Sequence, residues 1–475
     1  MIPFNQTKIV CTIGPATESE EMMEKLVLAG MDVMRLNFSH SFYEEHKERL
    51  ETLNRLNKKL NTNVASLLDT KGPEIRTHKF EGGKTTITFG SSVDIYMEEI
   101  LGNHEKFSVN YPKLYEDIDV GGSIVVDDGY LTLEVTSIDE EKKIIHTKAF
   151  NTHTIKDRRG INVPGVELQL DYISRKDLED LIWGCENNVD FIAASFVRKK
   201  EDVLQIREIL KEAGCESIQI IAKIENQEGV SNLDEITEVS DGVMIARGDL
   251  GVEVPPEEVP VIQKRIIEMC HKKGKLSITA TQMLESMQDH PKPTRAEVSD
   301  VANAILDGTD AIMLSGESAI GQYPVESVQV MQDIARRMER EINRRLFIER
   351  ASSISTNDIA SNIAVSVAHS VVEGKADLVI APTVSGNTAR LLSKFRPNTK
   401  ILALVPTDKL ARSLAINSCV HPVVFDLPKD TEALVKLSID FVKTHDFVKP
   451  GARVIITGGF PIGTPTNSFR ILDIE

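Results

Sequence analysis

Three charged side chains of types that suit chemistry on an anion stand at the ends of two successive apolar runs of the chain. Lys223 and Glu225 end one run, and Asp249 ends the next. Two carboxylates at neighbouring strand ends repel each other unless a cation lies between them. Hard oxygen ligands with open coordination positions suit Mg²⁺, which also accepts phosphate as a ligand. The pattern predicts a Mg²⁺ (or Mn²⁺) site on Glu225 and Asp249, with an ion pair to Lys223 or Arg247 as the alternative.

Lys223 stands two residues before Glu225, so both side chains would share one face of a strand. An ammonium group beside a bound metal ion can stabilise an oxyanion or an enolate. A plain salt bridge between Lys223 and Glu225 is the simpler alternative, and the sequence leaves both open.

A second group of oxygen-bearing side chains ends two earlier runs and consists of Asn37, Ser39, Asp69 and Thr70. One charge among several neutral oxygens suits a weakly held monovalent cation. Each of these residues alone is more often a helix cap or a turn residue.

The elements that carry these side chains are apolar runs that alternate with amphipathic stretches. The runs span residues 8–14, 32–38, 64–70, 190–196, 218–225, 241–249, 276–282 and 309–315. Eight β-then-α units predict a (β/α)8 TIM barrel, whose active site lies where the strands end. Apolar strands that repeatedly turn polar at the same end are hard to explain by packing alone.

Two segments depart from the barrel pattern. Between Thr70 and Leu168 the chain shows short alternating strands with glycine-rich turns, which predict an inserted all-β domain after the third strand. A long helical stretch, 325–349, precedes a C-terminal open α/β domain with strands at 378–381, 401–405, 423–426 and 453–457. We expect barrel segments at 1–70 and 169–345, the inserted domain at 71–168 as a lid, and a C-terminal regulatory domain at 346–475.

Composition narrows the class of protein. The 475 residues suggest about three domains, and the net charge of −17 argues against nucleic-acid binding. Five cysteines without a C-x-x-C pair favour reduced thiols. The chain contains no apolar run long enough to span a membrane and opens with no signal region, so a cytoplasmic location is expected.

Several stretches resemble the pyruvate kinase family, and together they cover nearly the whole chain. They include MRLNFSH, LLDTKGPEIRT, IIAKIENQEG, VMIARGDLGVE, TATQMLESM and GGFPIGTPTNSFRI. The resemblance implies a transferase of glycolysis that moves the phosphoryl group of phosphoenolpyruvate to ADP, giving pyruvate and ATP. It also implies Mg²⁺ (or Mn²⁺) and K⁺ as cofactors, and the family's layout of domains agrees with that predicted above.

Carried over by motif, the resemblance implies a role for each site residue. Arg35 holds the transferred phosphate and Lys223 neutralises the enolate, while Thr281 positions the substrate carboxylate and the side of proton delivery. The remaining roles are Glu225 and Asp249 for the divalent ion, Gly248 and Asp249 near the substrate carboxylate, Asn37, Ser39, Asp69 and Thr70 for K⁺, and Asn37, His40, Arg76 and Arg159 for the nucleotide.

The resemblance also implies a homotetramer and an allosteric effector site. After the strand at 378–381 comes a Ser/Thr/Gly loop that opens a helix, which presents hydroxyls and backbone N–H groups to an anion. The loop at 458–463 should lie at the same sheet edge, and in relatives the two loops enclose a phosphorylated effector. We expect Thr383, Ser385, Asn387 and Thr388 to bind the phosphate of a sugar phosphate or nucleotide monophosphate. An ordinary capped strand–helix turn is the alternative.

Two departures from the family pattern concern the inserted domain. Arg159 stands where the family usually has lysine, which keeps the charge but changes the geometry. The segment 151–154 lacks the glycines common there. Glu74, by contrast, is the residue that K⁺-dependent members carry; members that need no K⁺ carry lysine.

Two other functions compete with phosphoryl transfer. Another metal-dependent barrel enzyme, a lyase or aldolase, could act on the enolate of pyruvate or phosphoenolpyruvate, but it would not explain the inserted domain or MRLNFSH. A catalytically silent sensor of sugar phosphates would not need Arg35, Lys223, Glu225, Asp249 and Thr281 together.

Overall fold

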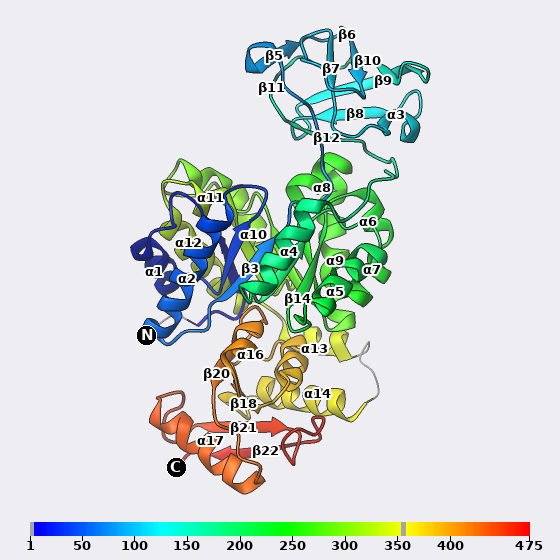
Figure 1. Ribbon diagram of the computed structural model, residues 1–475. Helices are drawn as coiled ribbons and strands as arrows, with labels where there is room; N and C mark the ends of the chain where they lie inside the picture. Colours follow the sequence, from blue (N-terminus) through cyan, green and yellow to red (C-terminus); the bar gives the residue numbers. More distant parts are fainter. Residues whose placement is uncertain (1–3, 353–357) are drawn as a thin grey trace.

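The structure is a computed structural model that describes residues 4–352 and 358–475, and the chain forms three parts in a row (Figure 1). A β/α barrel lies in the middle. An inserted β domain stands beyond one end of the barrel, and the C-terminal domain covers the other end. The predicted fold class is confirmed, whereas the residue boundaries proposed for the domains stay a prediction.

In the described chain, eight parallel strands close the barrel in the order β1-β17-β16-β15-β14-β13-β3-β2. They are β1 (Lys8–Thr12), β2 (Val33–Asn37), β3 (Ala65–Asp69), β13 (Phe191–Ala194), β14 (Gln219–Ile224), β15 (Gly242–Ala246), β16 (Leu276–Ala280) and β17 (Ala311–Leu314). Each lies within one of the eight apolar runs. Nearly continuous apolar strands are typical of a parallel sheet that is buried on both faces.

Helices cover the outside of the barrel (Figure 1). They are α1 (Glu20–Ala29), α2 (Tyr43–Leu60), α4 (Arg175–Glu186), α5 (Lys200–Glu212), α6 (Gln227–Ser231), α7 (Leu233–Val239), α8 (Arg247–Glu253), α9 (Val259–Lys273), α10 (Arg295–Asp307), α11 (Gly316–Ala319) and α12 (Pro324–Glu339).

All eight predicted strands end before the end of their apolar run, and at β15 and β16 the earlier end changes the setting of site residues. The run 241–249 is strand only to Ala246, because α8 begins at Arg247 and places Asp249 in its first turn. The run 276–282 is strand only to Ala280, because Thr281 and Gln282 adopt left-handed backbone angles, with φ of 64° and 52°.

The inserted domain follows β3 and lies within the described residues. It contains a seven-stranded sheet in the order β4-β12-β8-β9-β10-β6-β7 and a two-stranded sheet β11-β5. The strands are β4 (Ile75–Arg76), β5 (Lys84–Ile87), β6 (Ser92–Tyr96), β7 (Lys106–Ser108), β8 (Ser123–Val126), β9 (Leu131–Asp139), β10 (Ile144–Ala149), β11 (His153–Lys156) and β12 (Gly160–Asn162). A single helical turn, α3 (Leu114–Asp117), interrupts the expected all-β pattern.

The C-terminal domain has a five-stranded sheet in the order β20-β19-β18-β21-β22. The strands are β18 (Leu378–Pro382), β19 (Ile401–Val405), β20 (Val420–Val424), β21 (Arg453–Gly458) and β22 (Ser468–Asp473). The helices are α13 (Arg344–Ser352), α14 (Ile359–Val372), α15 (Asn387–Lys394), α16 (Asp408–Ser413) and α17 (Thr431–Thr444).

Three sequence predictions in this region were wrong. The strand predicted at 423–426 is β20, which begins at Val420. Strand β22 was missed, because it is an antiparallel edge strand whose residues are mostly exposed or half-buried. The helix predicted at 325–349 divides into α12 and α13. Arg344 explains that break, because its guanidinium donates to the carbonyl of Glu339 (3.0 Å) at the end of α12.

The C-terminal domain closes the base of the barrel. Ala415 and Ile416, which follow α16, are buried in one apolar cluster with residues inside the barrel such as Phe191. Asp190, immediately before β13, accepts from Arg412 (3.1 Å) and pairs with Lys409 (3.2 Å). Buried ion pairs and packed apolar side chains therefore fix the C-terminal domain to the ends of the strands opposite the predicted site.

None of the described helices is long and apolar enough to cross a membrane. Cys11, Cys185, Cys215, Cys270 and Cys419 are all free thiols. The expectation of reduced cysteines is therefore confirmed.

Candidate active site

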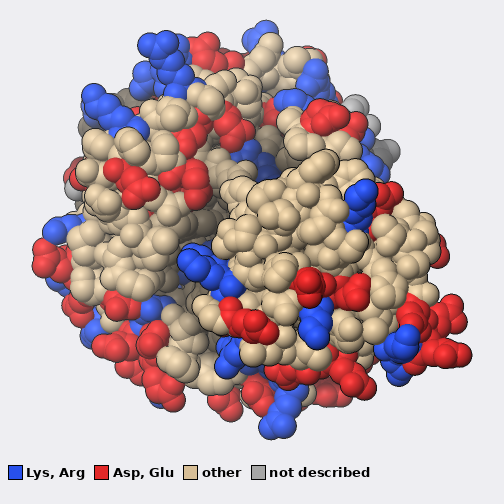
Figure 2. Space-filling model, turned by 90° about the horizontal axis from the view of Figure 1, so that it is seen from above, with Lys and Arg blue, Asp and Glu red and all other residues tan. Residues whose placement is uncertain are grey.

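The carboxyl ends of the barrel strands face the inserted domain (Figure 1). Seen from that side, the surface is hollowed, and Lys or Arg side chains lie within the hollows (Figure 2). In a protein with a net charge of −17, cations gathered at this end favour an anionic ligand.

At the centre of this end lies the buried carboxylate of Asp69, which is held between two cations. Arg35 Nε donates to Asp69 Oδ2 (2.6 Å), and Lys223 Nζ donates to Asp69 Oδ1 (3.0 Å). Arg35 also donates to the Thr12 hydroxyl (2.8 Å). Four strands thus supply one hydrogen-bonded cluster that fixes the direction of both cationic side chains.

Burial disfavours the charged form of Asp69, but Arg35 and Lys223 outweigh this effect and hold the pKa of the carboxyl below its usual value. Burial likewise disfavours the charge of Lys223, and the carboxylates of Asp69 and Glu225 raise its pKa above the usual value instead. The lysine is therefore a firmly protonated ammonium, which suits the stabilisation of an oxyanion.

Lys223 makes two further contacts, with Ser195 Oγ (2.7 Å) and with Glu225 Oε1 (3.0 Å). The Ser195 hydroxyl in turn donates to the carbonyl of Thr70 (2.6 Å). All three N–H donors of the ammonium therefore have partners in the described site.

Glu225 and Asp249 follow the neighbouring strands β14 and β15. Burial raises the pKa of Glu225 to about 7, although Lys223 and the backbone N–H of Phe196 (2.6 Å) favour its charged form. Burial also raises the pKa of Asp249, and the acidic Asp128 and Glu74 of the inserted domain add to this shift. Two buried carboxylates that are reluctant to ionise together are the donor set that a divalent cation would relieve.

Among the described residues, no cluster of three or more His, Cys, Asp or Glu side chains could hold a metal ion. The protein would therefore supply two carboxylates and leave the other positions to substrate and water, as is usual for Mg²⁺.

Thr281, which follows β16, contacts the first turn of α8. Its hydroxyl accepts from the backbone N–H of Gly248 (2.8 Å), and Arg247 donates to its carbonyl (2.8 Å) while pairing with Asp300 (2.7 Å). A positive φ is costly for a β-branched residue, so this local network holds Thr281 in place. Gly248 and Thr281 are therefore brought together as predicted.

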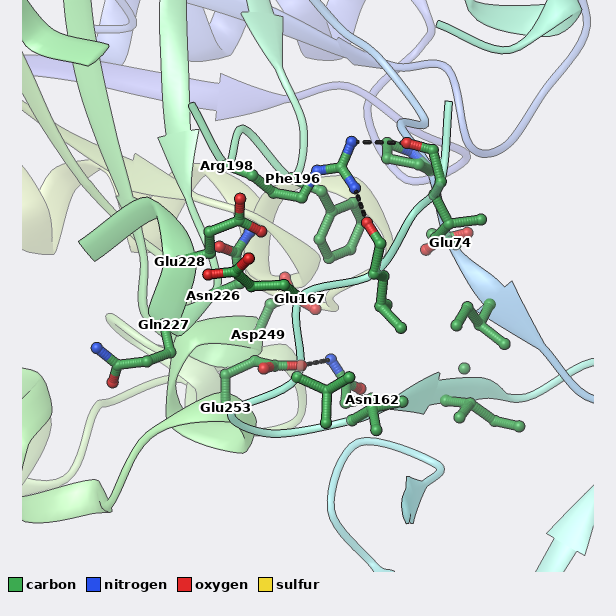
Figure 3. A pocket seen from close by; sticks show the side chains of 18 of the residues that line it. Glu74, Asn162, Glu167, Phe196, Arg198, Asn226, Gln227, Glu228, Asp249 and Glu253 are labelled. Carbon is green, nitrogen blue, oxygen red and sulfur yellow. Dashed lines mark hydrogen bonds between the residues drawn. The ribbon is translucent and has the colours of Figure 1, made fainter. Parts of the chain in front are cut away.

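A cleft of about 540 Å³ separates the inserted domain from the barrel (Figure 3). His40, Arg76, Arg159 and Asp249 line it, whereas Arg35, Lys223, Glu225 and Thr281 do not. At one wall of the cleft, Arg198 donates to the carbonyls of Leu168 (2.7 Å) and Leu170 (2.8 Å). Asn162 of β12 donates to Glu253 of α8 (2.8 Å).

The predicted nucleotide contacts of the inserted domain lie side by side on β4 and β12, where Arg76 is the register partner of Gly160. Arg76 makes two hydrogen bonds to Glu74 (2.8 and 3.1 Å). Arg159 lies 3.5 Å from Asp127, whose second oxygen pairs with His153 (2.8 Å). His153 stands in the segment without the family's glycines, so here this segment contributes a hydrogen-bond partner for Asp127.

The residues predicted to hold K⁺ lie together but are already bonded to the protein. Asn37 and Asp69 are register partners at the ends of β2 and β3. Asn37 Oδ1 accepts from the N–H of Ser39 (3.1 Å), and Thr70 Oγ1 accepts from the N–H of Ser195 (3.1 Å). The K⁺ assignment stays a prediction.

The predicted effector residues lie in the C-terminal domain, away from this cluster. Thr383 and Thr388 are buried, whereas Ser385 and Asn387 are exposed. The loop after β21 lies beside them as expected, because Thr388 Oγ1 and Thr466 Oγ1 are 2.8 Å apart.

Sequence reasoning assigned no role to Ser195, Thr12 or Phe196. Ser195 could have been found, because it is a polar residue at the end of an apolar run. Thr12 and the backbone of Phe196, which has a φ of 53°, contribute through contacts that only the fold reveals.

Comparisons with known proteins match these features. The family model of the pyruvate kinase barrel domain matches residues 4–328, and that of the pyruvate kinase alpha/beta domain matches residues 361–472. The chain belongs to the pyruvate kinase family. It is a phosphotransferase, and nothing in the comparisons favours a lyase, an aldolase or a silent sensor.

Individual pyruvate kinases resemble the chain over most of its length. That of Staphylococcus epidermidis is 49% identical over 470 residues, which cover 98% of this chain and 80% of the relative. That of Sporosarcina psychrophila is 48% identical with the same coverage. The crystal structure of a pyruvate kinase from Cryptosporidium parvum has a TM-score of 0.94 and 38% identity, covering 99% of this chain and 96% of that one.

The Asp69 cluster predicts a large loss of stability when its carboxylate is removed. Asp69→Asn leaves Arg35 without its carboxylate partner and Lys223 with Glu225 alone, and breaking one partner of a buried pair costs about 3–5 kcal/mol. We expect denaturant unfolding to report a loss of that order, with Asp333→Asn on the exposed face of α12 as the matched control. Equal stability of the two variants would contradict this account of the cluster.

Proposed function

We propose that the chain transfers the phosphoryl group of phosphoenolpyruvate to ADP, giving pyruvate and ATP, with Arg35 and Lys223 as its central cations. The observation that carries this proposal is the pair of cations held by Asp69 beside the buried carboxylate of Glu225 and the half-buried one of Asp249, at the carboxyl end of the barrel. Phosphoryl transfer needs positioning and charge neutralisation more than covalent help, and this site offers both.

In this mechanism Arg35 holds the phosphoryl group while an oxygen of ADP attacks phosphorus. The bond from phosphorus to the enol oxygen breaks, and the leaving group is the enolate of pyruvate. Lys223 donates to the enolate oxygen, and a proton then adds to the terminal carbon on the side that Thr281 faces. Thr281 and the first turn of α8, with the backbone groups of Gly248 and Asp249, orient the substrate carboxylate.

We infer that Glu225 and Asp249 bind one Mg²⁺ or Mn²⁺. When bound, the ion supplies Lewis-acid stabilisation of the anionic oxygens of the substrate. Glu225 would then bind the metal ion instead of Lys223. The N–H group of Lys223 that now contacts Glu225 would become available to the enolate oxygen.

The nucleotide side of the site is inferred from the cleft between the two domains. Asn37, His40, Arg76 and Arg159 are proposed to reach the phosphates of ADP. For this purpose Arg159 would exchange its long contact with Asp127 for a phosphate oxygen, since guanidinium groups bind phosphate in a bidentate fashion.

The assignment of Lys223 predicts a selective loss of turnover. Lys223→Met should lower kcat by several orders of magnitude with little change in the KM for phosphoenolpyruvate, because the interaction forms fully only in the transition state. A coupled assay of ADP-dependent pyruvate release measures both constants. An unchanged kcat with a raised KM would make Lys223 a binding residue, and release of pyruvate only with an aldehyde acceptor would contradict the proposed function.

The metal assignment has its own test. Glu225→Gln should abolish most of the turnover and weaken the binding of Mn²⁺, because an amide oxygen lacks the charge of a carboxylate. Mn²⁺ affinity can be measured by electron paramagnetic resonance without turnover. Glu253→Gln, at the other wall of the cleft, is the matched control, and equal Mn²⁺ affinity in wild type and Glu225→Gln would refute the assignment.

The potassium assignment predicts activation by K⁺. Asn37, Ser39, Asp69 and Thr70 offer one carboxylate and neutral oxygens, and Glu74 occupies the position where K⁺-independent members carry lysine. Activity should fall strongly in a buffer free of K⁺ and Na⁺ and return when K⁺ is added. Full activity without either cation would rule this out.

The effector assignment predicts activation by a phosphorylated metabolite acting on a homotetramer. Thr383, Ser385, Asn387 and Thr388 would hold its phosphate, and binding would favour the more active arrangement of the subunits. We expect fructose 1,6-bisphosphate, ribose 5-phosphate, glucose 6-phosphate or AMP to activate the wild type at subsaturating phosphoenolpyruvate, and Ser385→Glu to abolish this effect. Activation that survives in Ser385→Glu would contradict the effector site. A monomeric mass in light scattering would contradict the homotetramer.

A further inference from the structure

A small cavity lies between the base of the barrel and the C-terminal domain. Its walls come from the end of α9 with the residues that follow it and from α15, and its volume is about 20 Å³. Lys275 stands on the barrel side, Arg390 and Lys394 stand on α15, and Asn417 follows α16. Three cations from two domains therefore surround one cavity in a chain whose net charge is −17.

Lys275 is far along the chain from Arg390 and Lys394, and none of the three cations is ion-paired among the described residues. Lys275 donates to the carbonyls of Glu238 (3.0 Å) and Ser240 (2.7 Å), and Lys394 donates weakly to that of Lys272 (3.4 Å). Arg390 donates to the carbonyl of Ser385 and to the hydroxyl of Ser413. Within the described residues, no carboxylate oxygen lies within 4.0 Å of any of the three charged groups.

The nearest carboxylates are engaged elsewhere. Asp310, which also lines the cavity, pairs with Arg396 (3.0 Å), and Asp241 pairs with Arg207 (3.1 Å). The charge of Asp358 favours the charged form of Lys394, and Asp358 accepts two hydrogen bonds from Ser361. Asp310 and Asp241 are already paired with other cations and therefore do not neutralise the cavity.

The helix ends compensate only part of the charge. Both α9 and α15 end at this cavity, and a helix C-terminus carries roughly half a negative charge. Two such ends offset about one of the three positive charges. Burial accordingly lowers the pKa of Lys275, of Arg390 and of Lys394, which shows that their charged forms lack full compensation.

Asn417 points to a missing ligand by a separate observation. Its side chain lines the cavity and is only 5% exposed, and its Oδ1 has no hydrogen-bond partner among the described residues. A buried amide oxygen without a donor is costly, and the O–H group of a hydrogen phosphate ion in the cavity would supply one.

We propose that this cavity binds a small oxyanion of the class of inorganic phosphate, held by Lys275, Arg390 and Lys394. Oxyanions accept several charge-assisted hydrogen bonds at once, which matches two ammonium groups and a guanidinium. A cavity of about 20 Å³ has room for one small anion and excludes a sugar or a base.

The anion site is distinct from the effector loop but shares one residue with it. Arg390 holds the carbonyl of Ser385 (2.9 Å), and an anion that draws the guanidinium into the cavity competes with that hydrogen bond. Binding of phosphate would therefore loosen the loop proposed for the effector. The anion site itself does not rest on the proposed reaction.

The direct test is titration of the full-length enzyme with inorganic phosphate by calorimetry. Saturating phosphoenolpyruvate without ADP fills the phosphate subsite of the active site without turnover. Lys394→Gln should weaken phosphate binding at least about tenfold, because it removes one charge-assisted contact. Lys272→Gln is the matched control, since Lys272 carries the same charge nearby but pairs with Glu268 (3.1 Å) and does not line the cavity.

Further outcomes separate this site from the effector loop and from a structural role. Ser385→Glu should keep the phosphate affinity of the wild type; loss of binding in this variant alone would place the phosphate in the loop and overturn the proposal. Phosphate should raise the unfolding temperature of the wild type but not that of Lys394→Gln. Without phosphate, Lys394→Gln should be no less stable than Lys272→Gln.

The proposal is wrong if the wild type binds no phosphate under these conditions. It is also wrong if Lys394→Gln and Lys272→Gln lose the same affinity, or if chloride displaces phosphate so readily that no oxyanion preference remains.

Discussion

The site depends on one carboxylate, that of Asp69, which holds Arg35 and Lys223 at the carboxyl end of the barrel. A buried acid between two buried cations is stable only as a complete set, because removal of one member leaves the others uncompensated. This requirement fixes the orientation of both cations before any substrate arrives. A site organised in advance needs little rearrangement when negative charge develops on an oxygen, and this is where much of the electrostatic stabilisation in enzymes originates.

The same strands are constrained at their other ends. Asp190 precedes β13 and is held by Arg412 and Lys409 of the C-terminal domain, while Ser195 follows β13 and contacts Lys223. One four-residue strand thus joins the domain that closes the barrel to the cluster that would bind substrate. The apolar middle of each strand stabilises the barrel interior. The polar residues at the two ends of β13 serve different purposes: Asp190 holds the C-terminal domain, and Ser195 belongs to the candidate active site.

Much of this organisation can be predicted from the sequence, because it follows local patterns. Eight apolar runs predict eight strands, and polar residues such as Glu225 at their ends predict the site. The features that could not be predicted from the sequence depend on tertiary contacts. The first turn of α8 at Asp249 looks like the end of a strand, and the exposed edge strand β22 has no strong apolar pattern. Neither the contact of Thr12 with Arg35 nor the left-handed backbone of Thr281 has a local signal, because both depend on residues far away in the chain.

Contacts also run without interruption from the loop proposed for the effector to the candidate active site. Ser385 is bonded to Arg390, Arg390 to Ser413 of α16, Arg412 of the same helix to Asp190, and β13 then leads to Ser195. Such continuity alone does not couple two sites, because coupling requires an element with two discrete arrangements that both ligands bias. Helix α16 meets the structural part of this requirement, since it is a short helix wedged between two domains and held by ion pairs rather than by a continuous sheet. Arg390 can donate either to the carbonyl of Ser385 or to an anion in the neighbouring cavity. Among these contacts, the two alternatives of Arg390 are the two arrangements that a ligand could bias.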